Sequence, residues 1–293
     1  MTRLRHRVAG WGPTPPSERA TTPEEMLRAR RLVTDARRLV VLTGAGISTN
    51  SGVPDYRGPD APQATPMLYG DFVANEADRR RYWARAYVGW QRMGMAVPNS
   101  GHRLVADLEN SRPHRFGGLI TQNVDGLHEA AGSHGMIALH GRIADVICLD
   151  CARLFRRTSV QQWLAELNPD VDTDRQVGHA ELRPDGDAVV DEWQNFVVPP
   201  CPACGGVLKP DVVFFGEPVP TERVRTAIDW VDRADCLLVV GSSLTVMSGL
   251  RFVRQAAAAG TDVVIVNRGK TRGDDLATVK IDGDTSETLQ FLL

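Results

Sequence analysis

Four of the five cysteines form two Cys-x-x-Cys pairs, and this spacing predicts a metal site. The pairs are Cys148 with Cys151 and Cys201 with Cys204. Each pair offers two thiolates, and four thiolates complete the tetrahedral coordination of Zn²⁺. Because no further Cys or His lies close to them in sequence, no open coordination position is expected and the ion should be structural. Redox-active or unligated cysteines are the alternative, which the paired Cys-x-x-Cys spacing in a chain without a secretory signal disfavours.

A second group of reactive side chains follows two apolar runs that are typical of strands. Gln122, Asn123 and Asp125 come directly after the run at 116–121, and His140 follows the next run along the chain. Open α/β sheets bind ligands at the carboxyl ends of their strands. A histidine there is a general-base candidate, because its ordinary pKa lies near neutral pH. Helix capping by Asn123 or Asp125, or a purely structural His140, remains the alternative.

The short β-branched run at 39–43 ends in Gly44-Ala45-Gly46. A buried strand that ends in glycines lets the backbone approach a diphosphate closely. The third glycine of the usual dinucleotide motif is missing, so this turn alone is a weak indication.

Two later segments, 212–217 and 241–246, could present their backbone to an extended ligand such as a peptide strand. An ordinary core strand explains the first segment equally well. A phosphate- or ribose-binding turn is the alternative for the second, and the two roles are compatible.

The elements that must position these residues alternate between strands and helices. Strands are expected at 39–43, 116–121, 136–139, 212–215, 236–240, 262–266 and 279–281, and helices at 22–36, 71–93, 101–110, 125–131, 221–234, 247–259 and from 286. Such alternation predicts an α/β fold with a parallel sheet, helices on both faces and right-handed crossovers. Residues 144–209 carry both cysteine pairs and an Asp-rich middle, and we interpret them as an insertion.

Length and charge limit the class of protein. At 293 residues the chain can form one large domain or two modest ones. The net charge of −2 provides no large basic field, so nucleic acid is not an expected partner. No apolar run approaches the roughly 20 residues of a membrane span, and the basic N-terminus lacks the apolar core of a secretory signal.

Taken together, the motifs resemble the sirtuin family. The similarity extends from about residue 25 to the end and rests on residues 44–48, 52–57, 121–125, 127–128, 139–141, 209–217, 241–244, 266–267 and the four paired cysteines. It implies NAD-consuming removal of acyl groups from lysine by a Rossmann-type domain with a small zinc module. Residues 70–73, 81–85, 88–90, 148–151, 184–187 and 243–246 place the similarity closest to class II, the mitochondrial lipoamidase-type group and its bacterial relatives.

The resemblance also implies a domain division. Residues 1–21 would be a flexible extension, and 58–100 would form the cofactor loop and the helical part of a small domain. The NAD-binding domain would comprise 22–57, 101–143 and 210–293, with 144–209 as the zinc-binding module.

The same resemblance implies a role for each group of residues. The catalytic residues would be His140, Asn123 and Asp125, with His140 taking a proton from the ribose hydroxyls. NAD would contact Gly44, Ala45, Gly46, Ile47, Ser48, Pro54, Asp55, Tyr56, Arg57, Gln122, Asn123, Asp125, Gly241, Ser242, Ser243, Asn267, Gly269 and Thr285. Zinc would bind Cys148, Cys151, Cys201 and Cys204. The acylated-lysine peptide would contact Val213, Phe214, Phe215, Gly216 and Leu244.

The resemblance also bears on acyl preference and on competing activities. The desuccinylase class holds acidic acyl chains with a Tyr-x-x-Arg pair, and the apparently matching run here ends in Trp90 after Tyr87. This difference argues against short dicarboxylic acyl groups. A mono-ADP-ribosyltransferase, a non-catalytic NAD sensor and a dehydrogenase are the alternatives considered. We expect a monomer that acts on proteins or peptides, in the cytoplasm of a bacterium or the mitochondrial matrix of a eukaryote.

Overall fold

The structure is a computed structural model that describes residues 15, 20–56, 66–171, 190 and 193–293. Arg57, most of the predicted N-terminal extension and the Asp-rich middle of the insertion lie outside the described residues.

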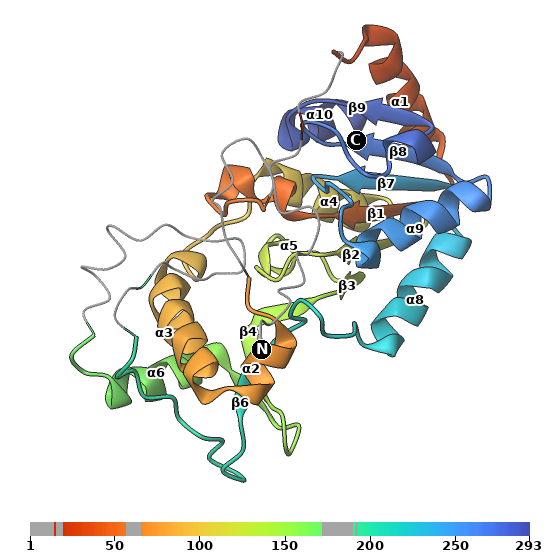
Figure 1. The fold of residues 1–293 in the computed structure, drawn as a ribbon. Helices are drawn as coiled ribbons and strands as arrows, with labels where there is room; N and C mark the ends of the chain where they lie inside the picture. The colour runs from red at the N-terminus through yellow and green to blue at the C-terminus, as the bar shows by residue number, and fades with distance from the viewer. Residues whose placement is uncertain (1–14, 16–19, 57–65, 172–189, 191–192) are drawn as a thin grey trace.

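A six-stranded parallel sheet has the strand order β3-β2-β1-β7-β8-β9 (Figure 1). Its strands are β1 (Leu39–Thr43), β2 (Phe116–Thr121), β3 (Met136–Ala138), β7 (Cys236–Val240), β8 (Asp262–Val266) and β9 (Val279–Ile281). Every residue of β1 and β7 is buried, as expected for central strands covered on both faces. The parallel sheet predicted from the sequence is therefore confirmed.

Helices cover both faces of this sheet. Helices α1 (Pro23–Asp35), α4 (Ser100–Ser111) and α10 (Thr285–Leu292) pack against the face that includes Leu39 and Val41. Helices α8 (Thr221–Asp232) and α9 (Met247–Ala258) pack against the opposite face, which includes Val40 and Leu42. Alternate residues of one strand thus belong to different cores, as strand geometry requires. Three short 3₁₀ helices, η1 (Ala45–Ile47), η2 (Thr49–Ser51) and η3 (Asp274–Leu276), lie in the connections.

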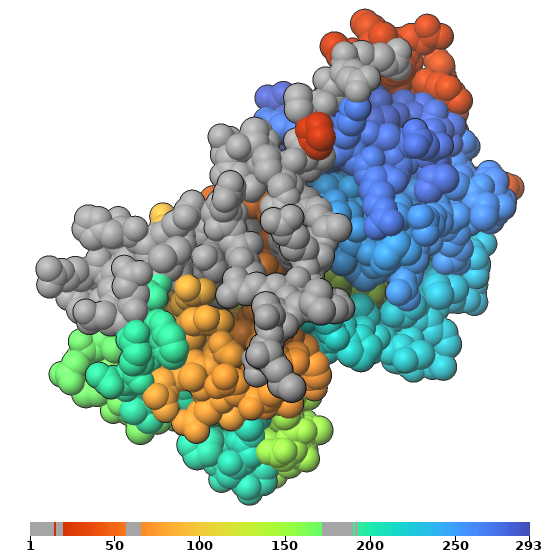
Figure 2. Space-filling model, viewed as in Figure 1, coloured from red at the N-terminus to blue at the C-terminus, as the bar shows by residue number. Residues whose placement is uncertain are grey.

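A smaller antiparallel sheet has the order β5-β4-β6. It consists of β4 (Gly141–Cys148), β5 (Leu154–Arg156) and β6 (Leu208–Val212), and it packs with α6 (Arg157–Leu167), α2 (Tyr69–Ala74) and α3 (Glu76–Met93). Figure 2 shows the green residues of the insertion beside the orange residues of α2 and α3. Segments from before and after α4 therefore build one hydrophobic core.

The prediction of a strand at 212–215 was wrong. The strand ends at Val212 and belongs to the smaller sheet, where it pairs with β4. Beyond it the Glu217 carboxylate accepts a hydrogen bond from Phe214 N at 2.8 Å, and the chain turns at Gly216. Residues 213–215 are apolar because their side chains line a cavity, and this produces the same pattern as a core strand.

The predicted domain boundaries at 143 and 210 fall within β4 and β6, and the division itself stays a prediction.

Three helix boundaries also differ from the predictions. Helix α4 begins at Ser100 rather than at 101, and Asn99 caps it, because its side chain accepts from the backbone of Gly101. The helix expected at 71–93 is two helices, α2 and α3, which Asn75 separates by capping the second. Helix α5 (Leu127–Ala130) is shorter than expected.

Candidate active site

A cavity of about 650 Å³ lies where the carboxyl ends of β1, β2, β7 and β8 face the segment that follows β6. Of the predicted site residues, those that line it are Gly44, Ala45, Gly46, Ser48, Pro54, Asp55, Tyr56, Gln122, Asn123, Asp125, His140, Val213, Phe214, Phe215, Gly216, Gly241, Ser242, Ser243, Leu244, Asn267 and Thr285. Ile47 is fully buried beneath it, and Gly269 is not among the lining residues. The volume is in the range typical of small-molecule sites.

The glycines after β1 allow two loops to meet closely. A Cβ on Gly44 would lie 2.8 Å from the Gly241 carbonyl oxygen, and one on Gly46 would lie 2.9 Å from Gly241 Cα. The N–H groups of Gly44 and Gly46 donate to Val240 O and Gly241 O, at 3.0 and 2.8 Å. This corrects the reason given for these glycines: their N–H groups are used within the fold, and the missing side chains bring the β1 and β7 turns together at the cavity.

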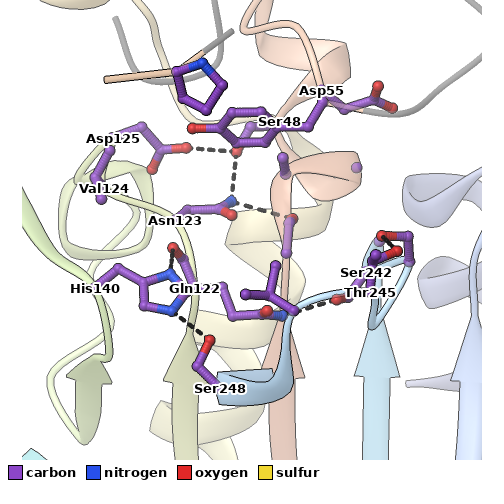
Figure 3. Close-up of a pocket in the computed structure, with 18 of the residues that line it drawn as sticks. Ser48, Asp55, Gln122, Asn123, Val124, Asp125, His140, Ser242, Thr245 and Ser248 are labelled. Carbon is purple, nitrogen blue, oxygen red and sulfur yellow. Dashed lines mark hydrogen bonds between the residues drawn. The ribbon is translucent and has the colours of Figure 1, made fainter. Parts of the chain in front are cut away.

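A polar network surrounds the Ser48 hydroxyl (Figure 3). Ser48 Oγ donates to Asp125 Oδ2 at 2.7 Å and accepts from Asn123 Nδ2 at 3.1 Å. The second Asp125 oxygen accepts from the backbone of Leu127 at 2.9 Å. Burial raises the pKa of Asp125, while these hydrogen bonds favour its ionised form. The contact with Leu127 fixes the turn before α5, but the N-cap of this helix is Gly126, so Asp125 lies in the cavity wall and does not cap the helix.

Two histidines to which the sequence analysis gave no role lie next to this network. His102 and His128 are fully buried, with ring centroids 4.8 Å apart. His102 Nδ1 accepts from Asn99 N, so the ring proton lies on Nε2, which is 3.3 Å from Ser48 Oγ. Burial lowers the pKa of His102 to about 4 and that of His128 to about 3, so both rings are neutral at pH 7. The capping position of His102, three residues after Asn99, was the signal available in the sequence.

His140 is oriented by hydrogen bonds at both ring nitrogens. Nδ1 lies 2.9 Å from the backbone oxygen of Gln122, and Nε2 lies 2.8 Å from Ser248 Oγ (Figure 3). Because a carbonyl oxygen only accepts, Nδ1 carries the ring proton and the lone pair of Nε2 is the basic site. Burial is the main cause that lowers the pKa of His140, so the ring is neutral at pH 7 and ready to accept a proton. Sequence reasoning missed Ser248.

The segment after β6 is fixed by a buried lysine that was also missed. Lys209 is 3% exposed, and its Nζ donates to Val212 O and, at 3.2 Å, to Pro210 O. It also forms an ion pair of 3.1 Å with Glu217. Val213 N donates to His140 O at 2.8 Å, so this wall of the cavity is attached directly to the histidine.

The aromatic residues of α3 differ from what the acyl-chain argument assumed. Tyr87 packs against Phe196, and Trp90 lies against the guanidinium of Arg157, which is 5.2 Å from its ring. Neither is a lining residue of the cavity, whereas Tyr82 is. Tyr82 is followed three residues later by Arg85, which gives the Tyr-x-x-Arg pattern that the run from Tyr87 to Trp90 lacks. The run chosen from the sequence was therefore not the one that reaches the cavity.

The four paired cysteines converge in the smaller sheet region. Their sulfur atoms all lie within 4.8 Å of one another. Cys148 Sγ is 3.5 Å from Cys204 Sγ, and Cys151 Sγ is 3.8 Å from Cys201 Sγ. Thiolates around one zinc ion lie about 3.8 Å apart when each Zn–S bond is about 2.3 Å. The cluster therefore fits one structural Zn²⁺, as the sequence predicted.

Comparisons with known proteins agree with these features. A family model described as "Sir2 family" matches residues 44–248. A Mycobacterium avium protein named NAD-dependent protein deacetylase 1 is 50% identical over 275 residues, covering 94% of this chain and 95% of its own length. The Bos taurus mitochondrial NAD-dependent protein lipoamidase sirtuin-4 is 43% identical, covering 96% of this chain and 88% of its own.

Solved structures give the same result. A Sir2 structure with a p53 peptide and NAD⁺ superimposes with a TM-score of 0.71 at 31% identity, covering 92% of this chain and 96% of that one. The resemblance inferred from the motifs is thus confirmed, and the chain belongs to the Sir2 family, the sirtuins.

Proposed function

We propose that this protein is an NAD-dependent protein lysine deacylase that releases nicotinamide and O-acyl-ADP-ribose. The observation that carries the proposal is the neutral His140, whose basic nitrogen faces the same cavity as the Ser48–Asn123–Asp125 network and the glycine turns. The names of the bacterial relatives and of the bovine lipoamidase support this reaction class. They do not favour the mono-ADP-ribosyltransferase alternative.

We assign the NAD subsites by their chemistry. The turns at 44–46 and 241–243 would receive the diphosphate and the adenosine ribose, with Asn267 and Thr285 beyond them. Asp55, Tyr56 and Arg57 would cover the nicotinamide end. Asn123 and Asp125 would orient nicotinamide or its ribose. Exclusion of water at this end protects an oxocarbenium-like ribose from hydrolysis.

The acylated lysine would enter along the wall formed by Val213, Phe214, Phe215 and Gly216, opposite Leu244. Its acyl oxygen would attack C1′ of the ribose as nicotinamide leaves, which produces an alkylamidate. His140 would then accept a proton from the ribose hydroxyls at Nε2, so that the ribose oxygen attacks this intermediate. General-base assistance of this kind is worth about 10²–10⁴-fold in rate.

The reaction is tested by incubating the protein with NAD and a panel of acyl-lysine peptides, with products identified by mass spectrometry. The panel comprises acetyl, butyryl, longer-chain, lipoyl, biotinyl and succinyl peptides. O-Acyl-ADP-ribose and free lysine peptide are the expected products, and ADP-ribose attached to a protein side chain would instead indicate the transferase. Preferred desuccinylation would overturn the argument from Trp90 and direct attention to Tyr82 and Arg85.

His140→Ala is the matched variant for the same assay. We expect it to lower deacylation by at least about 100-fold while the fold, followed by circular dichroism, is retained. Full deacylation by this variant would remove His140 from the role of base.

We further propose a cytoplasmic monomer without nucleic-acid partners. Among the described residues, no helix is sufficiently long and apolar to span a membrane. Size-exclusion chromatography with light scattering tests the oligomeric state.

A further inference from the structure

Ser248 forms a hydrogen bond to the ring nitrogen through which His140 would act. Its Oγ lies 2.8 Å from His140 Nε2, and both residues line the cavity (Figure 3). Because Nδ1 carries the ring proton and donates to Gln122 O, Nε2 can only accept. The Ser248 hydroxyl proton therefore points at the lone pair that general-base catalysis requires.

The position of Ser248 is fixed by the packing of the helix that carries it. Ser248 lies in the first turn of α9, next to Gly249. A Cβ on Gly249 would lie 2.5 Å from the Gln122 side-chain oxygen, so the start of α9 is packed tightly on Gln122. The side chain of Gln122 also donates to Ser242 Oγ at 2.8 Å. One residue thus orients His140 through its backbone oxygen and restrains Ser248 through its side chain.

The Ser248 hydroxyl retains an unused capacity to accept. Over the described part of the chain, its hydrogen bond to His140 is the one present at Oγ. A hydroxyl offers one donor and two acceptor lone pairs, so a hydroxyl group of a bound ligand can donate to it without displacing its proton from Nε2. Direct access of a ribose hydroxyl to Nε2 would instead require the existing 2.8 Å hydrogen bond to break.

From this geometry we propose that Ser248 is a proton relay between the ribose hydroxyl and His140. This inference rests on the proposed deacylase reaction. The ribose O–H bond breaks and its proton passes to Ser248 Oγ, while the original Ser248 proton passes to His140 Nε2. The ribose oxygen keeps the electron pair of the broken bond and uses it to form a bond to the amidate carbon, while the π electron pair of the carbon–nitrogen double bond moves onto the lysine nitrogen. Ser248 ends unchanged, and His140 ends as the imidazolium.

Ser248→Ala tests the relay, with Ser248→Thr as the conservative variant. We expect the alanine variant to lower kcat for O-acyl-ADP-ribose formation by about 10- to 100-fold, a part of the gain from general-base assistance. Its KM for NAD and its rate of nicotinamide exchange into NAD should stay near wild type, because nicotinamide leaves before the base acts. The threonine variant keeps the hydroxyl and should recover most of the rate. A purely structural role would affect exchange and deacylation together.

The matched control is Ser111→Ala, which removes an exposed helical hydroxyl that, among the described residues, bonds its own helix at Asp107 O. It should behave as wild type. A wild-type or increased deacylation rate in Ser248→Ala, or no recovery in Ser248→Thr, would overturn the relay.

His140→Ala separates this result from the function itself. If His140→Ala blocks deacylation but Ser248→Ala does not, the relay fails while the deacylase assignment stands. If neither wild type nor variants form O-acyl-ADP-ribose from any peptide of the panel, the proposed function fails. In the double variant, we expect no loss beyond that of His140→Ala, because the relay acts only through this histidine.

Discussion

The smaller antiparallel sheet and helices α2, α3 and α6 together form a smaller lobe. This lobe and the edge of the large sheet both bury polar side chains, but the buried groups have different roles. In the smaller lobe, the Lys209 ammonium donates to two backbone carbonyls and the Glu217 carboxylate. Arg157 lies between the rings of Trp83 and Trp90, 5.0 and 5.2 Å from their centroids. These contacts with fixed partners hold helices and loops together.

At the sheet edge, by contrast, the polar groups face a cavity. Ser48 and Asn123 are hydrogen-bonded to each other, His140 is held by Gln122 O and Ser248, and Ser248 still offers lone pairs on the cavity side. The difference teaches that burial of a polar group does not by itself indicate function. A cavity beside a group with remaining hydrogen-bonding capacity is the more informative feature. Three experiments test this comparison.

The largest effect is expected from the cysteine cluster of the smaller lobe. Cys201→Ser should abolish stoichiometric zinc and unfold the lobe, because structural zinc contributes about 10–16 kcal/mol of apparent binding free energy in small zinc domains. Metal content and thermal unfolding measure this effect. Cys236→Ala, at a buried cysteine outside the cluster, should retain the zinc. Full stability of metal-free Cys201→Ser would mean that this lobe does not depend on the ion.

A smaller loss is expected from the buried ion pair. Lys209→Met should lower the free energy of unfolding by about 3 kcal/mol, because it leaves Glu217 without its cation. The double variant Lys209→Met/Glu217→Gln should recover part of this loss in urea unfolding. Additive losses would show that the two residues are not coupled. The KM for the acyl peptide should rise in the single variant, since the wall at 212–217 loses its anchor.

The smallest effect concerns the neutral histidines under the site. The folded pKa of His102 is about 4 and that of His128 about 3, both below the ordinary value of 6.5. Below pH 6.5 the unfolded chain binds protons that the folded chain excludes, so stability falls as the pH falls. We expect about 2 kcal/mol lost per histidine between pH 7 and pH 5. His102→Gln and His128→Gln should each flatten the pH dependence of urea unfolding. An unchanged slope would mean that these rings are protonated at little cost.

The sequence by itself determined the features that depend on local pattern. Runs of β-branched residues that alternate with helical patterns predicted the parallel sheet, because the spacing of apolar residues in each element follows from backbone geometry. The cysteine spacing gave the zinc cluster, and residues after strand ends gave His140 and Asn123, since parallel strands end at one edge of a sheet.

Only the tertiary structure decided which residues from distant segments meet. Ser248 reaches His140 across 108 positions of the chain, and His102 reaches Ser48 across 54. The choice of Tyr82 over Tyr87 for the cavity wall depends on how α3 is rotated in its core. These contacts have no local signal, because the free energy that fixes them comes from packing between elements far apart in the sequence.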